Sequence, residues 1–145
     1  MKSVNTLSFE KKVVLLRVDF NVPLSSDFKI LDDTRIISAL PTIKKILNKK
    51  NKLIIISHLG RPGGSFAEKF SLTHLVKPLS NLLKKNVLFS ANCIGKPVLD
   101  RIKKMDYGDV LLLENLRFHT EEKNGNEVFA KELSKLADIY INDAF

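Results

Sequence analysis

The sequence contains 145 residues, of which 44% are hydrophobic and 28% are charged, and these values are typical of one globular domain with a sizeable core. It has no apolar run near the ~18–20 residues that a membrane span requires, and no N-terminal apolar run of the ~7–15 residues that a signal peptide requires. We therefore expect a cytoplasmic protein with no membrane partner. Cys93 is the only cysteine, so it cannot form an internal disulfide, and we expect it to be a small buried side chain.

The formal net charge of +8 at pH 7 fits a nucleic-acid surface, an anionic substrate or a generally lysine-rich protein. Lysine pairs such as Lys44-Lys45 and Lys84-Lys85 fall late in expected helices, where cations suit the helix dipole, so we expect most of this charge to be solvated surface. The nine Phe and two Tyr lie mostly at core positions rather than between basic residues, as a base-stacking surface would require. We therefore expect no nucleic-acid partner.

The first third of the chain predicts a strand, an excursion and a helix. The strand is expected at residues 13–18, and a short excursion or hairpin is expected at residues 24–31. Asp32-Asp33-Thr34 offers several N-cap candidates for a helix that should end near residue 48. Pro41 lies inside this helix and is expected to kink it or divide it into two pieces.

The middle of the chain begins with an unbroken apolar run at residues 53–56, which does not alternate with polar residues. Such a run is typical of a parallel strand that helices cover on both faces. Ser71 is expected to cap a helix that continues to about residue 83, with a kink at Pro78. A short third strand is expected at residues 87–89.

The last third predicts a small helix at residues 96–104, a second unbroken apolar strand at residues 110–113, a helix at about residues 128–137 and a fifth strand at residues 139–141. The alternation of strands and helices predicts a three-layer α/β fold with a parallel sheet of about five or six strands. Because the sequence stops at Phe145, directly after the last expected strand, we expect a truncated domain.

Polar residues follow several of the expected strands, at the edge of a parallel sheet where ligands bind. They are Asp19 and Asn21, then His58 and Arg61, then Arg117 and His119, with Arg35 at the start of the adjacent helix. Arginine and histidine donate charge-assisted hydrogen bonds to phosphate or carboxylate oxygens, whereas an aspartate accepts from a hydroxyl or a cation. This set predicts a site for a small anion that carries at least one hydroxyl group.

Arg35 is unusual because a cation in the first turn of a helix opposes the helix dipole, at a cost of about 0.3–1 kcal/mol. The placement suggests a functional role, although an ion pair with Asp32 or Asp33 would also explain it. Other chemistries lack their motifs: the sequence has no G-x-G-x-x-G after a strand, no P-loop, no metal-ligand spacing and no G-x-S-x-G elbow.

Four ordered motifs resemble the N-terminal domain of the phosphoglycerate kinase family. They are Arg17-Val-Asp-Phe-Asn-Val-Pro23, Asp33-Thr-Arg-Ile36, Ser57-His-Leu-Gly-Arg-Pro62 and Gly108-Asp-Val-Leu-Leu-Leu-Glu-Asn-Leu-Arg-Phe118, and the terminal Tyr140-Ile-Asn-Asp-Ala-Phe145 is also similar to a family segment. The resemblance implies that residues 1–145 are the Rossmann-like triose-phosphate-binding domain of a two-domain, monomeric kinase of glycolysis. It also implies that Mg-ATP or Mg-ADP binds to a C-terminal nucleotide domain absent from this chain, so the fragment alone is expected to be inactive and to bind substrate weakly or not at all.

The resemblance assigns roles to individual residues toward 3-phosphoglycerate and 1,3-bisphosphoglycerate. Asp19 and Asn21 would contact the hydroxyl and carboxylate region, with Phe20, Leu59 and Gly60 lining the pocket. His58, Arg61 and Arg117 would hold the phosphate and carboxylate ends, and Arg35 would meet the transferring phosphoryl group as the catalytic residue. The main alternative is a non-catalytic module that binds phosphate or carboxylate.

Overall fold

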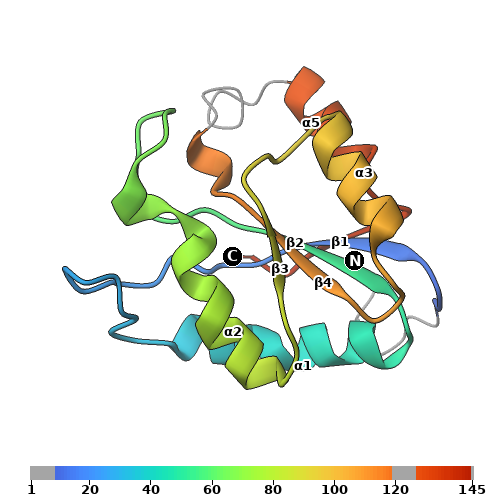
Figure 1. The fold of residues 1–145 in the computed structure, drawn as a ribbon, viewed down its shortest axis with the longest axis horizontal. Coiled ribbons are helices and arrows are strands. Elements are labelled where there is room, and N and C mark those ends of the chain that lie inside the picture. Colours follow the sequence, from blue (N-terminus) through green and yellow to red (C-terminus); the bar gives the residue numbers. More distant parts are fainter. Residues whose placement is uncertain (1–8, 119–126, 145) are drawn as a thin grey trace.

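The computed structural model describes residues 9–118 and 127–144, and its centre is a parallel sheet (Figure 1). Five strands form the sheet in the order β3-β4-β2-β1-β5. Their bounds are β1 Val13–Arg17, β2 Lys52–Ile56, β3 Leu88–Ser90, β4 Val110–Leu113 and β5 Ile139–Asn142. Every neighbouring pair is parallel, as the alternation of strands and helices predicts.

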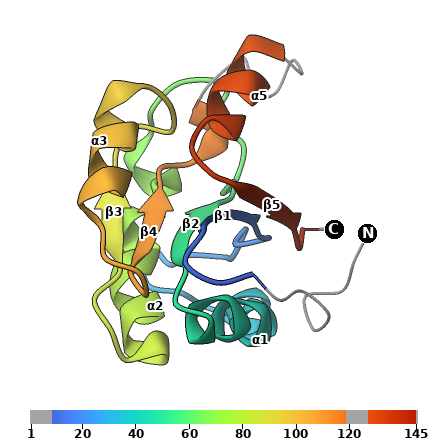
Figure 2. The same cartoon turned by 90° about the vertical axis from the view of Figure 1, so that its right-hand side faces the viewer.

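Helices cover both faces of this sheet, so the domain has three layers (Figure 2). The α-helices are α1 Thr34–Asn48, α2 Val76–Leu83, α3 Lys96–Lys104 and α5 Glu127–Ser134, and the short 3-10 helices are η2 Glu68–Phe70, η3 Leu72–Leu75 and η4 Leu116–Phe118. The helices α1 and α2 lie on one face of the sheet and α3 and α5 on the other. This arrangement confirms the predicted α/β class. No helix within residues 9–118 and 127–144 has the length and apolar character needed to cross a membrane.

The two faces of the central strands enter two separate cores. Leu53 and Ile55 of β2 pack with α1 and α2, whereas Ile54 and Ile56 pack with α3 and α5. All four side chains are at most 2% exposed. Burial on both faces explains why β2 and β4 are continuous apolar runs, since a strand with one solvated face alternates between apolar and polar residues.

The structure corrects one expectation about the prolines and refines the other. Residues 34–48 form a single helix that continues through Pro41, so Pro41 does not divide it into two pieces, and the alternative of a kink stays a prediction. Pro41 lies on the exposed side of α1, where a carbonyl that loses its amide partner can bond to water. The helix expected at residues 71–83 is instead η3 followed by α2, which places Pro78 in the first turn of α2, where a missing N–H is tolerated.

Smaller predictions are confirmed. Leu24 pairs with Ile30 in an antiparallel bridge, so the excursion at residues 24–31 is a hairpin. The Ser71 hydroxyl accepts a hydrogen bond from the Thr73 amide and caps η3. Cys93 is fully buried, and its thiol donates to the Glu114 carbonyl at 3.0 Å.

Truncating Ile54 to alanine should lower the free energy of unfolding by about 2–5 kcal/mol, because the fully buried side chain would leave a cavity beneath α3 and α5. The same change at Ile37, which is 48% exposed on α1, should alter it by less than about 1 kcal/mol. Urea unfolding followed by circular dichroism measures both values. Similar losses in the two variants would contradict the packing described here.

Candidate anion-binding site

The strand order brings three polar loops together at the carboxyl edge of the sheet. Because β2 lies between β1 and β4, the loop after β2 is flanked by the loops after those two strands. The register aligns Arg17 of β1 with Ile56 of β2, so the two loops begin at the same level. The predicted site residues therefore share one edge of the sheet.

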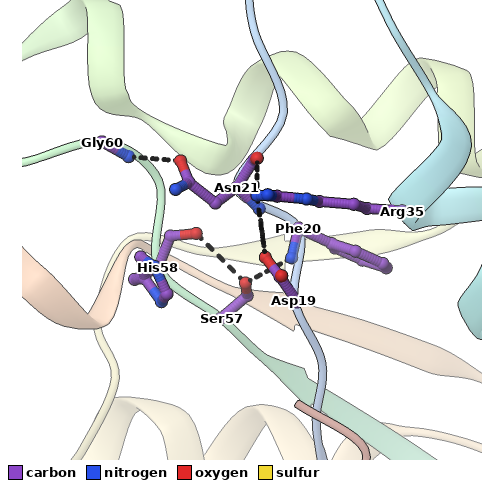
Figure 3. Close-up of polar contacts among 7 residues, drawn as sticks. All are labelled: Asp19, Phe20, Asn21, Arg35, Ser57, His58 and Gly60. Carbon is purple, nitrogen blue, oxygen red and sulfur yellow. Dashed lines mark hydrogen bonds and ion pairs between the residues drawn. The ribbon is translucent and has the colours of Figure 1, made fainter. Parts of the chain in front are cut away.

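The loops after β1 and β2 are joined by side-chain hydrogen bonds (Figure 3). The Ser57 hydroxyl, which is fully buried, accepts a bond of 2.9 Å from the Phe20 amide. The Asn21 side-chain oxygen accepts a bond of 2.9 Å from the Gly60 amide. Asp19 accepts from the Asn21 amide at 3.1 Å, which fixes the turn after β1. These bonds hold the two loops in one arrangement.

Arg35 reaches from the first turn of α1 across to the loop after β1. Its Nη1 donates to the Asn21 carbonyl and lies 3.4 Å from Asp19 Oδ1. The alternative that Arg35 pairs with Asp32 or Asp33 is therefore not what the structure shows. The Thr34 hydroxyl and amide, more than the Arg35 guanidinium, lower the pKa of Asp32.

The contact between Arg35 and Asp19 is weak enough to be exchanged for another anion. The Arg35 side chain is 51% exposed and that of Asp19 is 31% exposed. Exposed ion pairs of this kind contribute about 0–1 kcal/mol, whereas hydrogen bonds to a charged group contribute about 1.5–3 kcal/mol. An incoming phosphate or carboxylate could take over the guanidinium.

Two hollows adjoin Arg35. The larger, of about 810 Å³, is lined by Arg35, Asn21, Gly60 and Lys69 together with Val22, Pro23, Leu24, Ser25, Ser26, Phe28, Leu59 and Phe70. The smaller, of about 190 Å³, is lined by Asp19, Arg35, Ser38, Ala39 and Asp143. Arg35 lines both hollows, so its guanidinium can bind an anion in either one.

The remaining predicted residues occupy the same edge but neither of these two hollows. His58 and Arg117 are partly buried and Arg61 is exposed, and the His58 ring does not point toward Asn21 or Arg35 (Figure 3). A common basin for Asp19, Arg35, His58, Arg61 and Arg117 thus remains a prediction. His119 lies outside the described residues.

Phe20 differs from its expected role as a lining residue. Its side chain is 0% exposed and packs in the core beneath α1, and only its backbone takes part in the loop contacts. The cause is alternation along the extended chain: Val18 and Phe20 point into the core, while Asp19 points to the edge.

Four residues that the sequence left without a role contribute to this edge: Ser57, Lys69, Glu114 and Asn115. Lys69 lines the larger hollow from η2. Ser57, Glu114 and Asn115 follow buried apolar strands directly and are themselves at most 5% exposed. A polar residue immediately after a strand that is buried on both faces is the signal that could have identified them. The described residues contain no cluster of His, Cys, Asp or Glu suited to a metal ion.

The model of one protein family, described as phosphoglycerate kinase, matches residues 4–145. The chain belongs to the phosphoglycerate kinase family. The phosphoglycerate kinase of Syntrophobacter fumaroxidans is 49% identical over 145 residues, covering 100% of this chain and 36% of the relative. That of Pseudothermotoga lettingae is 48% identical over 143 residues, covering 99% and 36%.

Solved structures of the family have the same fold. The phosphoglycerate kinase of Coxiella burnetii matches with a TM-score of 0.84 at 38% identity, over 97% of this chain and 34% of that one. The enzyme of Pyrococcus horikoshii OT3 matches with a TM-score of 0.87 at 33% identity, over 99% and 36%. The chain therefore spans about a third of the length of these family members.

Replacing Gly60 by alanine tests whether this position, whose amide donates to Asn21, requires glycine. Its φ is +62°, and an added Cβ would lie 2.2 Å from the Phe70 ring. Gly63, with φ +81°, has open space around the same position. We expect Gly63→Ala to cost about 1–2 kcal/mol of unfolding free energy from backbone strain alone, and Gly60→Ala to cost a further ~1–3 kcal/mol from the clash. Equal losses in the two variants, measured by urea unfolding, would contradict this account.

Proposed function

We propose that the complete gene product carrying this chain is a phosphoglycerate kinase. It transfers a phosphoryl group reversibly between ATP and the carboxyl group of 3-phosphoglycerate, giving ADP and 1,3-bisphosphoglycerate. Family membership supports this reaction. The observation in this chain that supports it is the position of Arg35, an exposed cation at the carboxyl edge of the sheet that contacts Asp19 and the Asn21 carbonyl.

In this proposal the described edge is the 3-phosphoglycerate side of the reaction. Asp19 and Asn21 contact the glycerate hydroxyl and carboxylate region, where Asp19 accepts from the hydroxyl, and Leu59 and Gly60 lie beside Asn21. His58, Arg61 and Arg117, which lie on the flanking loops, bind the phosphate and carboxylate ends through charge-assisted hydrogen bonds. The two hollows beside Arg35 are not lined by His58, Arg61 or Arg117.

Arg35 acts as the catalytic residue by stabilising the transferring phosphoryl group. Phosphoryl transfer passes through a loose transition state with charge spread over the equatorial oxygens, so catalysis depends on positioning and on cations that meet this charge. A guanidinium that leaves Asp19 when the phosphoryl group arrives supplies such a cation. Mg-ATP would donate the phosphoryl group, or Mg-ADP would accept it in the reverse direction, and we propose that this nucleotide binds outside residues 1–145. The resemblance further supports a monomeric enzyme of the cytoplasm.

The reaction is tested by incubating the complete gene product with ATP, Mg²⁺ and 3-phosphoglycerate and measuring ADP release. We expect ADP release that requires 3-phosphoglycerate. Binding of 3-phosphoglycerate without turnover would overturn the proposal in favour of a non-catalytic binding module. The absence of both binding and turnover would overturn the assignment of the site as well.

The role of Arg35 is tested by Arg35→Ala in the complete gene product. We expect kcat to fall by about a hundredfold or more, because a cationic donor to the transition-state charge is lost, while KM for 3-phosphoglycerate changes far less. Arg101→Ala is the matched control, since Arg101 is exposed in the last turn of α3, far from the edge, and both constants should stay within about twofold. Comparable turnover of Arg35→Ala and the unmutated protein would refute the assignment.

A further inference from the structure

A buried polar pair follows β4, and the proposed reaction does not use either side chain. Glu114 is 5% exposed and Asn115 is 0% exposed. Burying polar groups costs free energy unless their hydrogen bonds are made inside the protein, so their partners show what the pair holds in place.

Within the part of the chain that the structure describes, the Asn115 side chain makes three hydrogen bonds, and two of them go to segments that carry predicted anion-binding residues. Its Nδ2 donates to the Leu59 carbonyl at 2.7 Å and to the Phe70 carbonyl at 2.9 Å. Its Oδ1 accepts from the Arg117 amide at 2.9 Å. One amide group thus closes the loop between residues 59 and 70 and fixes the start of η4.

Glu114 secures the far end of the same loop. Its Oε2 accepts from the Ser71 hydroxyl at 2.6 Å, and its Oε1 accepts from the amides of Leu72 at 2.8 Å and Asn115 at 2.9 Å. The carboxylate therefore fixes the first residues of η3 and the backbone of Asn115 at once.

The loop after β2 is consequently held from both sides by an asparagine. Asn21, after β1, accepts from the Gly60 amide, and Asn115, after β4, donates to the Leu59 carbonyl. His58 and Arg61 lie on this loop, and Arg117 lies on the segment that Asn115 fixes directly. Three of the predicted anion-binding residues thus lie on the two segments to which this one buried side chain bonds.

We infer that Asn115, supported by Glu114, is the positioning residue of the anion-binding edge. It sets the backbone from which His58, Arg61 and Arg117 reach the phosphate and carboxylate of the substrate. The inference rests on the proposed function for the identity of the substrate, but the hydrogen bonds that carry it are independent of that function.

Asn51 provides a matched control elsewhere in the same fold. It is also 0% exposed, and its side chain donates to the Ile46 carbonyl at 2.9 Å and accepts from the Lys12 amide at 2.9 Å. These partners lie at the opposite edge of the sheet, where β1 and β2 begin. A purely structural asparagine of equal burial and similar bonding is therefore present in the chain.

The test replaces each asparagine by aspartate in the complete gene product. Asn115→Asp keeps the shape and the acceptor for the Arg117 amide but sets a carboxyl oxygen against the carbonyls of Leu59 and Phe70. We expect KM for 3-phosphoglycerate to rise at least about tenfold and KM for ATP to stay within about twofold, because only the anion-binding edge loses its fixed geometry. Asn51→Asp should leave both values within about twofold even though the two variants lose similar thermal stability.

The pH dependence of the KM for 3-phosphoglycerate in Asn115→Asp is a further test. A purely structural role of Asn115 would leave this pH dependence unchanged. Burial against two carbonyls raises the pKa of a carboxyl group, and its protonated form can again donate one hydrogen bond. The ratio of the KM of Asn115→Asp to that of the unmutated protein should therefore fall as the pH is lowered. An unchanged KM for 3-phosphoglycerate in Asn115→Asp, or an equal rise in Asn51→Asp, would overturn the inference.

Two further measurements cover the remaining outcomes. If Asn115→Asp does not fold, Ser71→Ala is used instead, because it removes one donor to Glu114. We then expect the KM for 3-phosphoglycerate to rise by about two- to threefold, and no rise would overturn the inference.

If the unmutated protein shows no turnover, the proposed function fails separately. Hydrogen exchange at the Gly60 and Arg117 amides should then still be faster in Asn115→Asp than in Asn51→Asp, and equal exchange would overturn the positioning role.

Discussion

The place of β2 between β1 and β4 is the constraint on which the candidate site depends. A parallel strand in the middle of a sheet must be apolar on both faces, so its specific chemistry can appear only after it ends. In this chain the loop after β2 emerges with a neighbouring loop on each side, and an asparagine from each neighbour bonds to it. The buried sheet thereby fixes the spacing of groups that are distant in sequence.

The edge combines a fixed part with a movable one. Asn115 and Ser57 are 0% exposed and fully bonded, so displacing their loops would leave buried polar groups without partners, at a cost of about 1–3 kcal/mol each. Arg35 is half exposed and sits against the dipole of its own helix, and its contacts are an exposed ion pair with Asp19, worth at most about 1 kcal/mol, and a bond to the Asn21 carbonyl. Loops held in a fixed position suit the binding of an anion in its ground state. A cation that exchanges partners suits the negative charge that develops during phosphoryl transfer.

The sequence predicted the layers well because burial dictates them. The strands at residues 53–56 and 110–113 were expected within one residue of β2 and β4, since an unbroken apolar run between turns leaves few alternatives. The proline predictions were less accurate. Whether a proline interrupts a helix depends on its exposure and on where the helix begins. Pro41 is exposed on α1, and Pro78 lies in the first turn of α2, and neither position could be read from the sequence.

The site was less predictable than the fold, and Phe20 and Asn115 show why. A motif places Phe20 between two polar residues, but only the alternation of the extended chain reveals that its side chain enters the core. Asn115 stands in the sequence as one polar residue among several, and its importance arises from bonds to residues 45 and 56 positions away. Sequence motifs identify the residues that can contact a ligand. The residues that position them can be identified only when the hydrogen-bond partners of each buried polar atom are known. The residues that determine how tightly this edge binds an anion are therefore expected to include side chains that never touch the anion.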